Sequence, residues 1–143
     1  MKIYVASSWR CEYQPRVVDS LQDAGHEVYD FRHPHPNDYG FAWGDIAGEW
    51  LDWEPAQYCQ ALTHPIANAG FSSDFEGMKW ADACVMVLPC GRSAHLEAGW
   101  FVGNGKPLFI LILEKCEPEL MYKMATSINL SISELLEKLE TKQ

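Results

Sequence analysis

The sequence has few basic residues and no long apolar run, and each shortage excludes a class of function. Only 11 Lys and Arg stand against 20 Asp and Glu, which gives a formal net charge of −9 over 143 residues. A chain this acidic is repelled by a phosphate backbone, so no nucleic-acid partner is expected. The longest wholly aliphatic or aromatic run, Leu108 to Leu113, is far shorter than the roughly 20 residues that span a bilayer. We therefore expect no membrane partner.

The chain also lacks the cysteine patterns of secreted and zinc proteins. Its five cysteines are odd in number and contain no C-x-x-C pair, so neither a disulfide framework nor a zinc site is indicated. The apolar stretch Ile3 to Ala6 is too short for the core of a signal peptide, and polar residues follow it at once. These features predict a cytoplasmic protein with reduced thiols.

Apolar runs and helical patterns alternate along most of the chain. Short apolar runs bounded by turn residues are typical of buried strands, and apolar residues three or four apart are typical of helices. Strands are predicted at residues 2–6, 26–31, 84–88 and 108–113, with a fifth around residues 127–130. Helices are predicted at residues 15–24, 55–67, 73–81 and 93–102, and from residue 131 onward. This order predicts an α/β fold in one domain, residues 1–143: a doubly wound parallel sheet, flavodoxin-like or Rossmann-like, of about five strands flanked by helices.

Residues 33–54 interrupt this pattern with prolines, glycines and five large aromatic residues. No Lys or Arg occurs between His33 and Met78. A lid with several rings and no basic residue suits stacking on a flat heterocycle, and Trp43 is a predicted substrate contact. The alternative is that two or three of the rings pack against the edge of the sheet. The H-x-H pair of His33 and His35 has no third ligand at a matching spacing, so no metal is expected.

Residues 89–97 leave a buried strand, turn through Gly91 and enter a helix at Ser93. The free N–H groups of the first helical turn, together with the helix dipole and Arg92, predict an anion site. Glu97 falls about one turn inside this helix. There the dipole favours the carboxylate form, which makes Glu97 available as a nucleophile or base. The alternative is that Glu97 only stabilises the helix N-terminus.

Asp74 follows Ser73, which opens an S-x-x-E capping box. Crossover helices run antiparallel to the strands, so helices that begin at Ser73 and Ser93 would both start near the carboxyl edge of the sheet. Asp74 and Glu97 would then face one cleft. Two carboxylates beside an anion-binding turn suit the breaking of a glycosidic bond. The alternative is that Asp74 only caps its helix.

Four segments in a fixed order now carry a family resemblance: residues 74–82, 84–89 and 91–99, and the motif Gly-Lys-Pro at 105–107. Together they resemble the nucleoside 2-deoxyribosyltransferase family, whose superfamily includes the 2′-deoxynucleoside 5′-phosphate N-hydrolases. The opening residues 3–8 resemble the family's first strand and substrate loop. The resemblance covers about residues 2 to 113, and its most specific part is the order of an Asp, a strand, a glycine turn and Glu-x-Gly.

The resemblance implies a double displacement at the N-glycosidic bond. Glu97 is the implied nucleophile, which forms a covalent glycosyl ester, and Asp74 handles protons at the leaving base or holds the sugar hydroxyls. It implies no cofactor, a small-molecule nucleoside or nucleotide as partner, and a homodimer or larger homo-oligomer. The family's transferases use an amide side chain from a neighbouring subunit after the fourth strand. Residues 117–122 offer no amide here, and cleavage and transfer both stay open.

Two loops bear on the choice between a nucleoside and its 5′-monophosphate. We predict substrate contacts at Tyr4, Ser7, Ser8, Arg10, Gly91, Arg92 and Ser93. Their hydroxyls and arginines suit a phosphate, although the arginines could instead pair with nearby carboxylates. Two other functions remain as alternatives: a glycohydrolase that cleaves the nicotinamide bond of an NAD-type dinucleotide, and a nucleotide sensor without turnover.

Overall fold

The computed structural model describes residues 1–142 and separates into two compact units. The first comprises Met1–Asp30 together with the residues from Met78 onward, and the second comprises Phe31–Gly77. The insertion predicted at residues 33–54 is thus part of a larger segment that continues through residue 77. None of the helices formed by residues 1–142 has the length and apolar character that crossing a bilayer requires.

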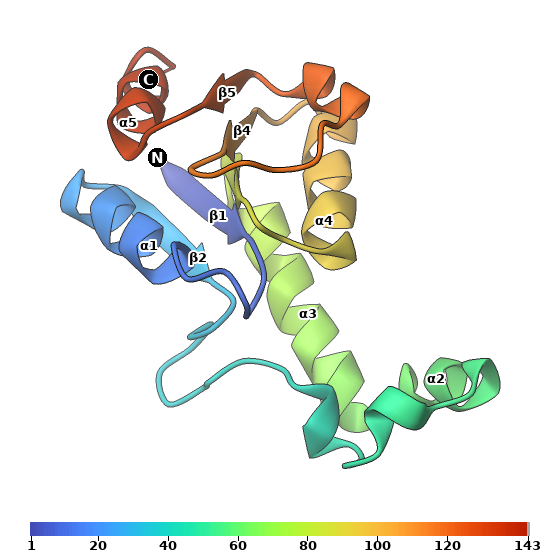
Figure 1. The fold of residues 1–143 in the computed structure, drawn as a ribbon. Helices are drawn as coiled ribbons and strands as arrows, with labels where there is room; N and C mark the ends of the chain where they lie inside the picture. The colour runs from blue at the N-terminus through green and yellow to red at the C-terminus, as the bar shows by residue number, and fades with distance from the viewer. Residues whose placement is uncertain (143) are drawn as a thin grey trace. The chain divides into compact units, whose positions relative to one another are not determined.

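The first unit contains a sheet of five parallel strands (Figure 1). The strands are β1 (Lys2–Ala6), β2 (Glu27–Asp30), β3 (Ala83–Val87), β4 (Leu108–Leu111) and β5 (Ser127–Asn129). Their order in the sheet is β2-β1-β3-β4-β5. The strand order reverses direction between β1 and β3, and this is the switch point where α/β sheets bind ligands at the carboxyl ends of their strands. The predicted fold class is confirmed.

Helices cover both faces of this sheet. The α-helices of the chain are α1 (Gln14–Asp23), α2 (Pro55–Ala61), α3 (Pro65–Trp80), α4 (Arg92–Gly103) and α5 (Ile132–Glu140). Side chains alternate along β1, so Ile3 joins the core under α1 and α5, where it is buried with Leu21 and Leu135. Tyr4 points to the opposite face and packs on Phe101 of α4, with ring centroids 5.6 Å apart. Figure 1 shows α1 and α5 on one side of the sheet and α4 on the other.

The two predicted capping boxes have different outcomes. Ser131 caps α5 as predicted: its hydroxyl accepts from the Glu134 N–H at 3.1 Å, while the Glu134 carboxylate accepts from the Leu130 N–H at 2.6 Å and not from the cap residue itself. The prediction at Ser73 is wrong, because α3 already begins at Pro65 and runs through Ser73 without a break. The Ser73 hydroxyl instead bonds His35 Nε2 at 2.8 Å. Asp74 therefore lies in a helix interior and not at a helix N-terminus.

The start of α4 also differs from the prediction. The helix begins at Arg92 with Gly91 as its N-cap, so Ser93 lies in the first turn and is not the cap. Glu97 follows in the next turn. The backbone N–H groups near the helix start remain the donors of the predicted anion site, because the first turn of any helix leaves them without intrahelical acceptors.

The second unit contains two 3-10 helices, η1 (Trp43–Asp45) and η2 (Trp50–Asp52), followed by α2 and most of α3. Trp43 packs edge to face against three other rings of this unit, with centroid distances of 4.8 Å to Phe41, 5.8 Å to Trp53 and 5.8 Å to Tyr58. Phe41 also lies against Gly70 of α3, where an added Cβ would come within 2.9 Å of the Phe41 Cβ. The absence of a side chain at Gly70 thus allows the insertion to pack on α3.

The last turn of α3 belongs to the first unit, where Lys106 holds it. The Lys106 Nζ donates to the backbone carbonyls of Met78 at 3.1 Å, Lys79 at 2.9 Å and Ala81 at 2.6 Å. These carbonyls lie at a helix C-terminus, where the last acceptors have no intrahelical partner. The ammonium also lies 5.4 Å from the centre of the Trp100 ring. The Gly-Lys-Pro motif therefore supplies a cap for α3.

Candidate functional site

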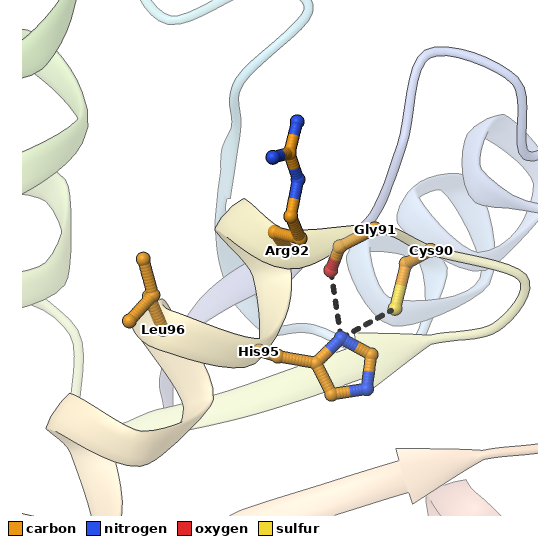
Figure 2. Close-up of a pocket in the computed structure, with 5 residues that line it drawn as sticks. All are labelled: Cys90, Gly91, Arg92, His95 and Leu96. Atoms are coloured by element: carbon orange, nitrogen blue, oxygen red, sulfur yellow. Dashed lines mark hydrogen bonds between the residues drawn. The ribbon is translucent and has the colours of Figure 1, made fainter.

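The candidate site is built on the turn between β3 and α4. All five residues of β3 are buried, and the chain leaves the carboxyl end of this central strand to reach Gly91. A shallow cavity of about 510 Å³, wide open to solvent, lies there, lined by Cys90, Gly91, Arg92, His95 and Leu96 (Figure 2). This position agrees with the general placement of ligand sites in doubly wound sheets.

Arg92 is an exposed residue of this cavity. In Figure 2 its guanidinium extends away from the Gly91 carbonyl and the His95 ring. Within residues 1–142, no hydrogen bond or ion pair engages the side chain of Arg92 or that of Arg10. Neither arginine therefore has the carboxylate partner that the alternative interpretation required, and both guanidinium groups are available to an anion.

The loop after β1 lies at the same edge of the sheet. The Ser7 hydroxyl donates to the carbonyl of Val87, the last residue of β3, at 2.9 Å. The Ser8 hydroxyl accepts from the Arg10 N–H at 3.2 Å, which shapes the loop locally. Since β1 and β3 are neighbours, the two loops predicted to hold a phosphate both leave the carboxyl ends of adjacent strands. The sequence predicted this juxtaposition through topology alone.

Glu97 is half-buried on α4, and its charge reaches two nearby thiols. Burial, and then the Glu97 carboxylate, raise the pKa of the Cys84 thiol well above its usual range. Burial, Cys11 and Glu97 raise the pKa of Cys90 to about 12. A thiol that stays protonated is a poor nucleophile, so Cys90 is not a candidate for nucleophilic attack. Glu97 is the nucleophile candidate that remains at this turn.

Glu97 and Arg92 lie on different faces of α4. Residues four apart share a helix face, so Glu97 projects on the side of Ser93, whereas Arg92 projects on the side of Leu96. Glu97 accordingly does not line the cavity. A ligand that used both groups would extend across the start of the helix, with an anionic end at the first-turn N–H groups and Arg92.

The site contains a hydrogen-bonded pair that sequence reasoning missed. The His95 ring bonds the Gly91 carbonyl through Nδ1 at 2.7 Å and the Tyr122 hydroxyl through Nε2 at 2.9 Å. Its Nδ1 also lies 4.0 Å from the Cys90 sulfur (Figure 2). Tyr122 belongs to the 3-10 helix η3 (Leu120–Met124), between β4 and β5. No sequence pattern linked these two residues, although His95 lies inside the motif that carried the family resemblance.

Two predicted substrate contacts are packed among other rings. Tyr4 is fully buried, stacked on Tyr29 with centroids 5.2 Å apart and planes at 6°. Trp43 is half-buried in the aromatic cluster of the second unit. Both rings therefore serve packing. Their chemistry suited a ligand equally well, and the sequence did not reveal which neighbours would cover them.

Asp74 is half-buried in α3, within the second unit. Its chain neighbour Ser73 is joined to His35 by the 2.8 Å bond described above, so the H-x-H segment is attached to the turn of α3 that carries Asp74. Across residues 1–142 there is no group of three His, Cys, Asp or Glu side chains that could hold a metal ion. His35 is thus engaged by a hydrogen bond to α3.

Several solved structures have a fold similar to that of this chain. No family model matches the chain, and no curated protein matches its sequence. A solved 2-deoxyribosyltransferase from Bacillus psychrosaccharolyticus is 20% identical, with 95% of this chain and 90% of that one covered and a TM-score of 0.61. The CMP N-glycosidase BcmB of Clostridium botulinum is 16% identical, with 98% and 99% covered and a TM-score of 0.50. A conserved protein from Enterococcus faecalis is 14% identical, with 100% and 99% covered and a TM-score of 0.63. The chain thus has the fold of the nucleoside 2-deoxyribosyltransferases.

Proposed function

We propose that the protein cleaves the N-glycosidic bond of a nucleoside 5′-monophosphate. The observation that carries this proposal is the start of α4. There an unpaired Arg92 guanidinium and the first-turn N–H groups precede the half-buried Glu97 carboxylate by about one helical turn. Fold neighbours that carry the names 2-deoxyribosyltransferase and CMP N-glycosidase support the same class of bond.

Glu97 is the nucleophile in this reaction. One carboxylate oxygen forms a bond to the anomeric carbon while the bond to the base breaks, and the electron pair leaves with the base nitrogen. Water then attacks the anomeric carbon of the glycosyl ester and releases Glu97. The positive end of the α4 dipole favours negative charge near the start of the helix, which suits a carboxylate nucleophile.

Asp74 handles the proton in this reaction, a role that comes from the sequence resemblance. Its carboxyl gives a proton to the departing base and takes one from the water that resolves the ester. Protons and charge then balance over the two steps, and both carboxyl groups return to their starting states.

The phosphate is the part of the substrate that the turn recognises. The N–H groups of Arg92 and Ser93 and the guanidinium groups of Arg92 and Arg10 supply charge-assisted donors, each worth about 1.5 to 3 kcal/mol. In a protein with a net charge of −9, such a site needs local positive charge, and two of the four arginines lie in these two loops. A monophosphate should therefore be preferred to its parent nucleoside.

Hydrolysis is favoured over transfer to a second base. The family's transferases use an amide from a neighbouring subunit, whereas residues 117–122 contain none. Tyr122 of this segment is bonded to His95 of its own chain. Adding an excess of free base to the reaction tests the point: hydrolysis yields the free sugar phosphate, and transfer yields a new nucleotide.

Incubation with nucleosides, 5′-monophosphates and NAD, with chromatography of the released base, tests the function. Wild type should release base from a monophosphate. Glu97→Gln, which keeps the shape and removes the attacking charge, should lose at least about a hundredfold in turnover while still binding the ligand. Release of nicotinamide from NAD alone would support the glycohydrolase instead. Binding without any release would support a sensor, and near-normal activity of Glu97→Gln would contradict the mechanism.

We also propose that the protein forms a homodimer or a larger homo-oligomer. Leu96 on α4 is 78% exposed, and Leu120 on η3 is 76% exposed. The His95–Tyr122 bond places these two elements side by side, so exposed apolar side chains occur on two neighbouring elements of the surface. Light scattering on the purified protein should give at least twice the monomer mass of 16.3 kDa. A monomer at working concentration would refute this proposal.

A further inference from the structure

The Gly91 carbonyl receives two hydrogen bonds at the start of α4. The His95 backbone N–H donates at 3.4 Å, as expected in a helix, and the His95 ring nitrogen Nδ1 lies at 2.7 Å. A carbonyl oxygen only accepts, so Nδ1 must carry a proton. In the neutral imidazole Nε2 is then the acceptor, and the Tyr122 hydroxyl, 2.9 Å away, donates to it.

Tyr122 is suited to be a permanent donor. Burial, followed by the influence of Cys90, raises the pKa of the Tyr122 hydroxyl to about 12, so it keeps its proton at neutral pH. The two rings also lie nearly parallel, with centroids 5.8 Å apart and planes at 17°. The Tyr122 hydroxyl thereby sets both the tautomer and the orientation of the imidazole, as partners of a histidine commonly do.

The bonded carbonyl belongs to Gly91, the residue just before the first-turn N–H groups of α4. Gly91 is the N-cap, and nothing lies within 4 Å of where its Cβ would be, so packing adds no restraint to the long helical bond from the His95 N–H. Glycine has the widest conformational freedom of any residue, and this turn therefore needs restraint from elsewhere. A carbonyl that rotated toward the ligand would oppose a phosphate, because its oxygen carries a partial negative charge and cannot donate a hydrogen bond.

We propose that Tyr122 and His95 are positioning residues that hold the Gly91 carbonyl aside, so that the turn Gly91–Ser93 presents its N–H groups to a phosphate. The proposal rests on the function proposed above and extends it to a residue of the β4–β5 connection. Tyr122 acts through His95 and touches no substrate.

Tyr122→Phe removes the hydroxyl and keeps the stacked ring. It should raise KM for the 5′-monophosphate about three- to tenfold, the value of one hydrogen bond, with kcat unchanged. KM for the parent nucleoside should not change, because the nucleoside does not use the turn. An equal change for both substrates, or a change in kcat alone, would overturn the proposal and leave the glycosidase function intact.

A double-mutant cycle separates positioning from a general structural effect. His95→Asn has a shorter side chain. Its amide N–H can still donate a hydrogen bond to the Gly91 carbonyl, but the amide cannot reach the Tyr122 hydroxyl. Adding Tyr122→Phe to His95→Asn should then have no further effect on KM for the monophosphate. Effects that simply add would show that the two residues act independently, which contradicts the proposal.

Tyr13→Phe is the matched control. It also removes one tyrosine hydrogen bond to the β4–β5 connection, the 2.8 Å bond from the Tyr13 hydroxyl to Glu114, but that bond does not involve the turn. It should leave the monophosphate preference unchanged. If wild type cleaves no substrate, thermal unfolding with inorganic phosphate still tests the turn: stabilisation should be present in wild type and Tyr13→Phe and weaker in Tyr122→Phe. Equal stabilisation of all three would refute the positioning role.

Discussion

The ammonium of Lys106 lies 2.6 Å from the carbonyl oxygen of Ala81, just beyond the end of α3. Two further carbonyls of the same helix end share this ammonium. A long side chain with three donors is well matched to three acceptors, and arginine, with a flat rigid fork, would not fit them in the same way. Lys106 of the Gly-Lys-Pro motif is therefore a structural residue, whereas Glu97 and Arg92 of α4 are the proposed functional residues.

Lys106→Met should lower the free energy of unfolding by about 2 to 3 kcal/mol, because charge-assisted hydrogen bonds are lost and the carbonyls of α3 lose their partner. Urea unfolding followed by circular dichroism measures the change. Lys115→Met, at an exposed position, is the control and should have little effect. A loss no larger than that of the control would show that water replaces the ammonium without cost.

Gly70→Ala and Gly99→Ala should change stability in opposite directions. Both glycines lie in helices, where alanine is intrinsically favoured by about 1 kcal/mol. At Gly99 an added Cβ meets nothing within 4 Å, so the variant should gain up to about this amount. At Gly70 the Cβ meets Phe41 at 2.9 Å, and crowding should cost about 1 to 3 kcal/mol. Thermal unfolding of the two variants tests this prediction. Equal shifts of their unfolding midpoints would contradict the packing of Phe41 on α3.

The stability of the protein should fall as the pH is lowered through the titration of His26. This side chain is 7% exposed, and burial, followed by the N-terminal ammonium, lowers its pKa from the ordinary 6.5. The unfolded chain then binds the proton more readily than the folded one. The contribution of neutral His26 to the free energy of unfolding is therefore fully present above pH 6.5 and is lost as the pH falls below it. Unfolding midpoints between about pH 8 and about pH 5 should fall less steeply in His26→Gln. An unchanged slope would assign the pH dependence to other groups.

Asp74→Asn should reduce turnover by roughly a hundredfold or more, because the amide cannot exchange a proton with the leaving base. The loss should be smallest for a substrate whose leaving group, such as nitrophenolate, departs without protonation. Asp23→Asn in α1 is the exposed control. An equal loss for every leaving group would assign Asp74 to sugar binding, and no loss would leave it a structural residue of α3.

Arg92→Ala should remove most of the preference for a monophosphate. Losing one charge-assisted contact should lower kcat/KM for the monophosphate about 10- to 150-fold while leaving the nucleoside unaffected. Arg16→Ala carries the same charge change at an exposed position of α1 and should not alter the ratio. If wild type prefers the nucleoside, the turn does not bind substrate phosphate, and transfer becomes the better proposal.

The sequence by itself determined the sheet. Parallel strands are buried on both faces, so their sequences are short continuous apolar runs. The runs predicted at residues 2–6 and 108–113 coincide closely with β1 and β4. The capping box at Ser131 was readable for a similar reason, because a cap and the residue three positions later interact within one turn.

Only the tertiary structure decided what the same local signals mean in context. Ser73 has the same spacing to Glu76 as Ser131 has to Glu134, yet it lies inside a helix, because α3 already begins at Pro65 and continues through it. Tyr4 packs on Phe101, and His95 bonds Tyr122, although the two residues of each pair are far apart in the chain. Neither leaves a periodic trace in the sequence, since packing and hydrogen bonding between distant segments depend on where the folded backbone brings them.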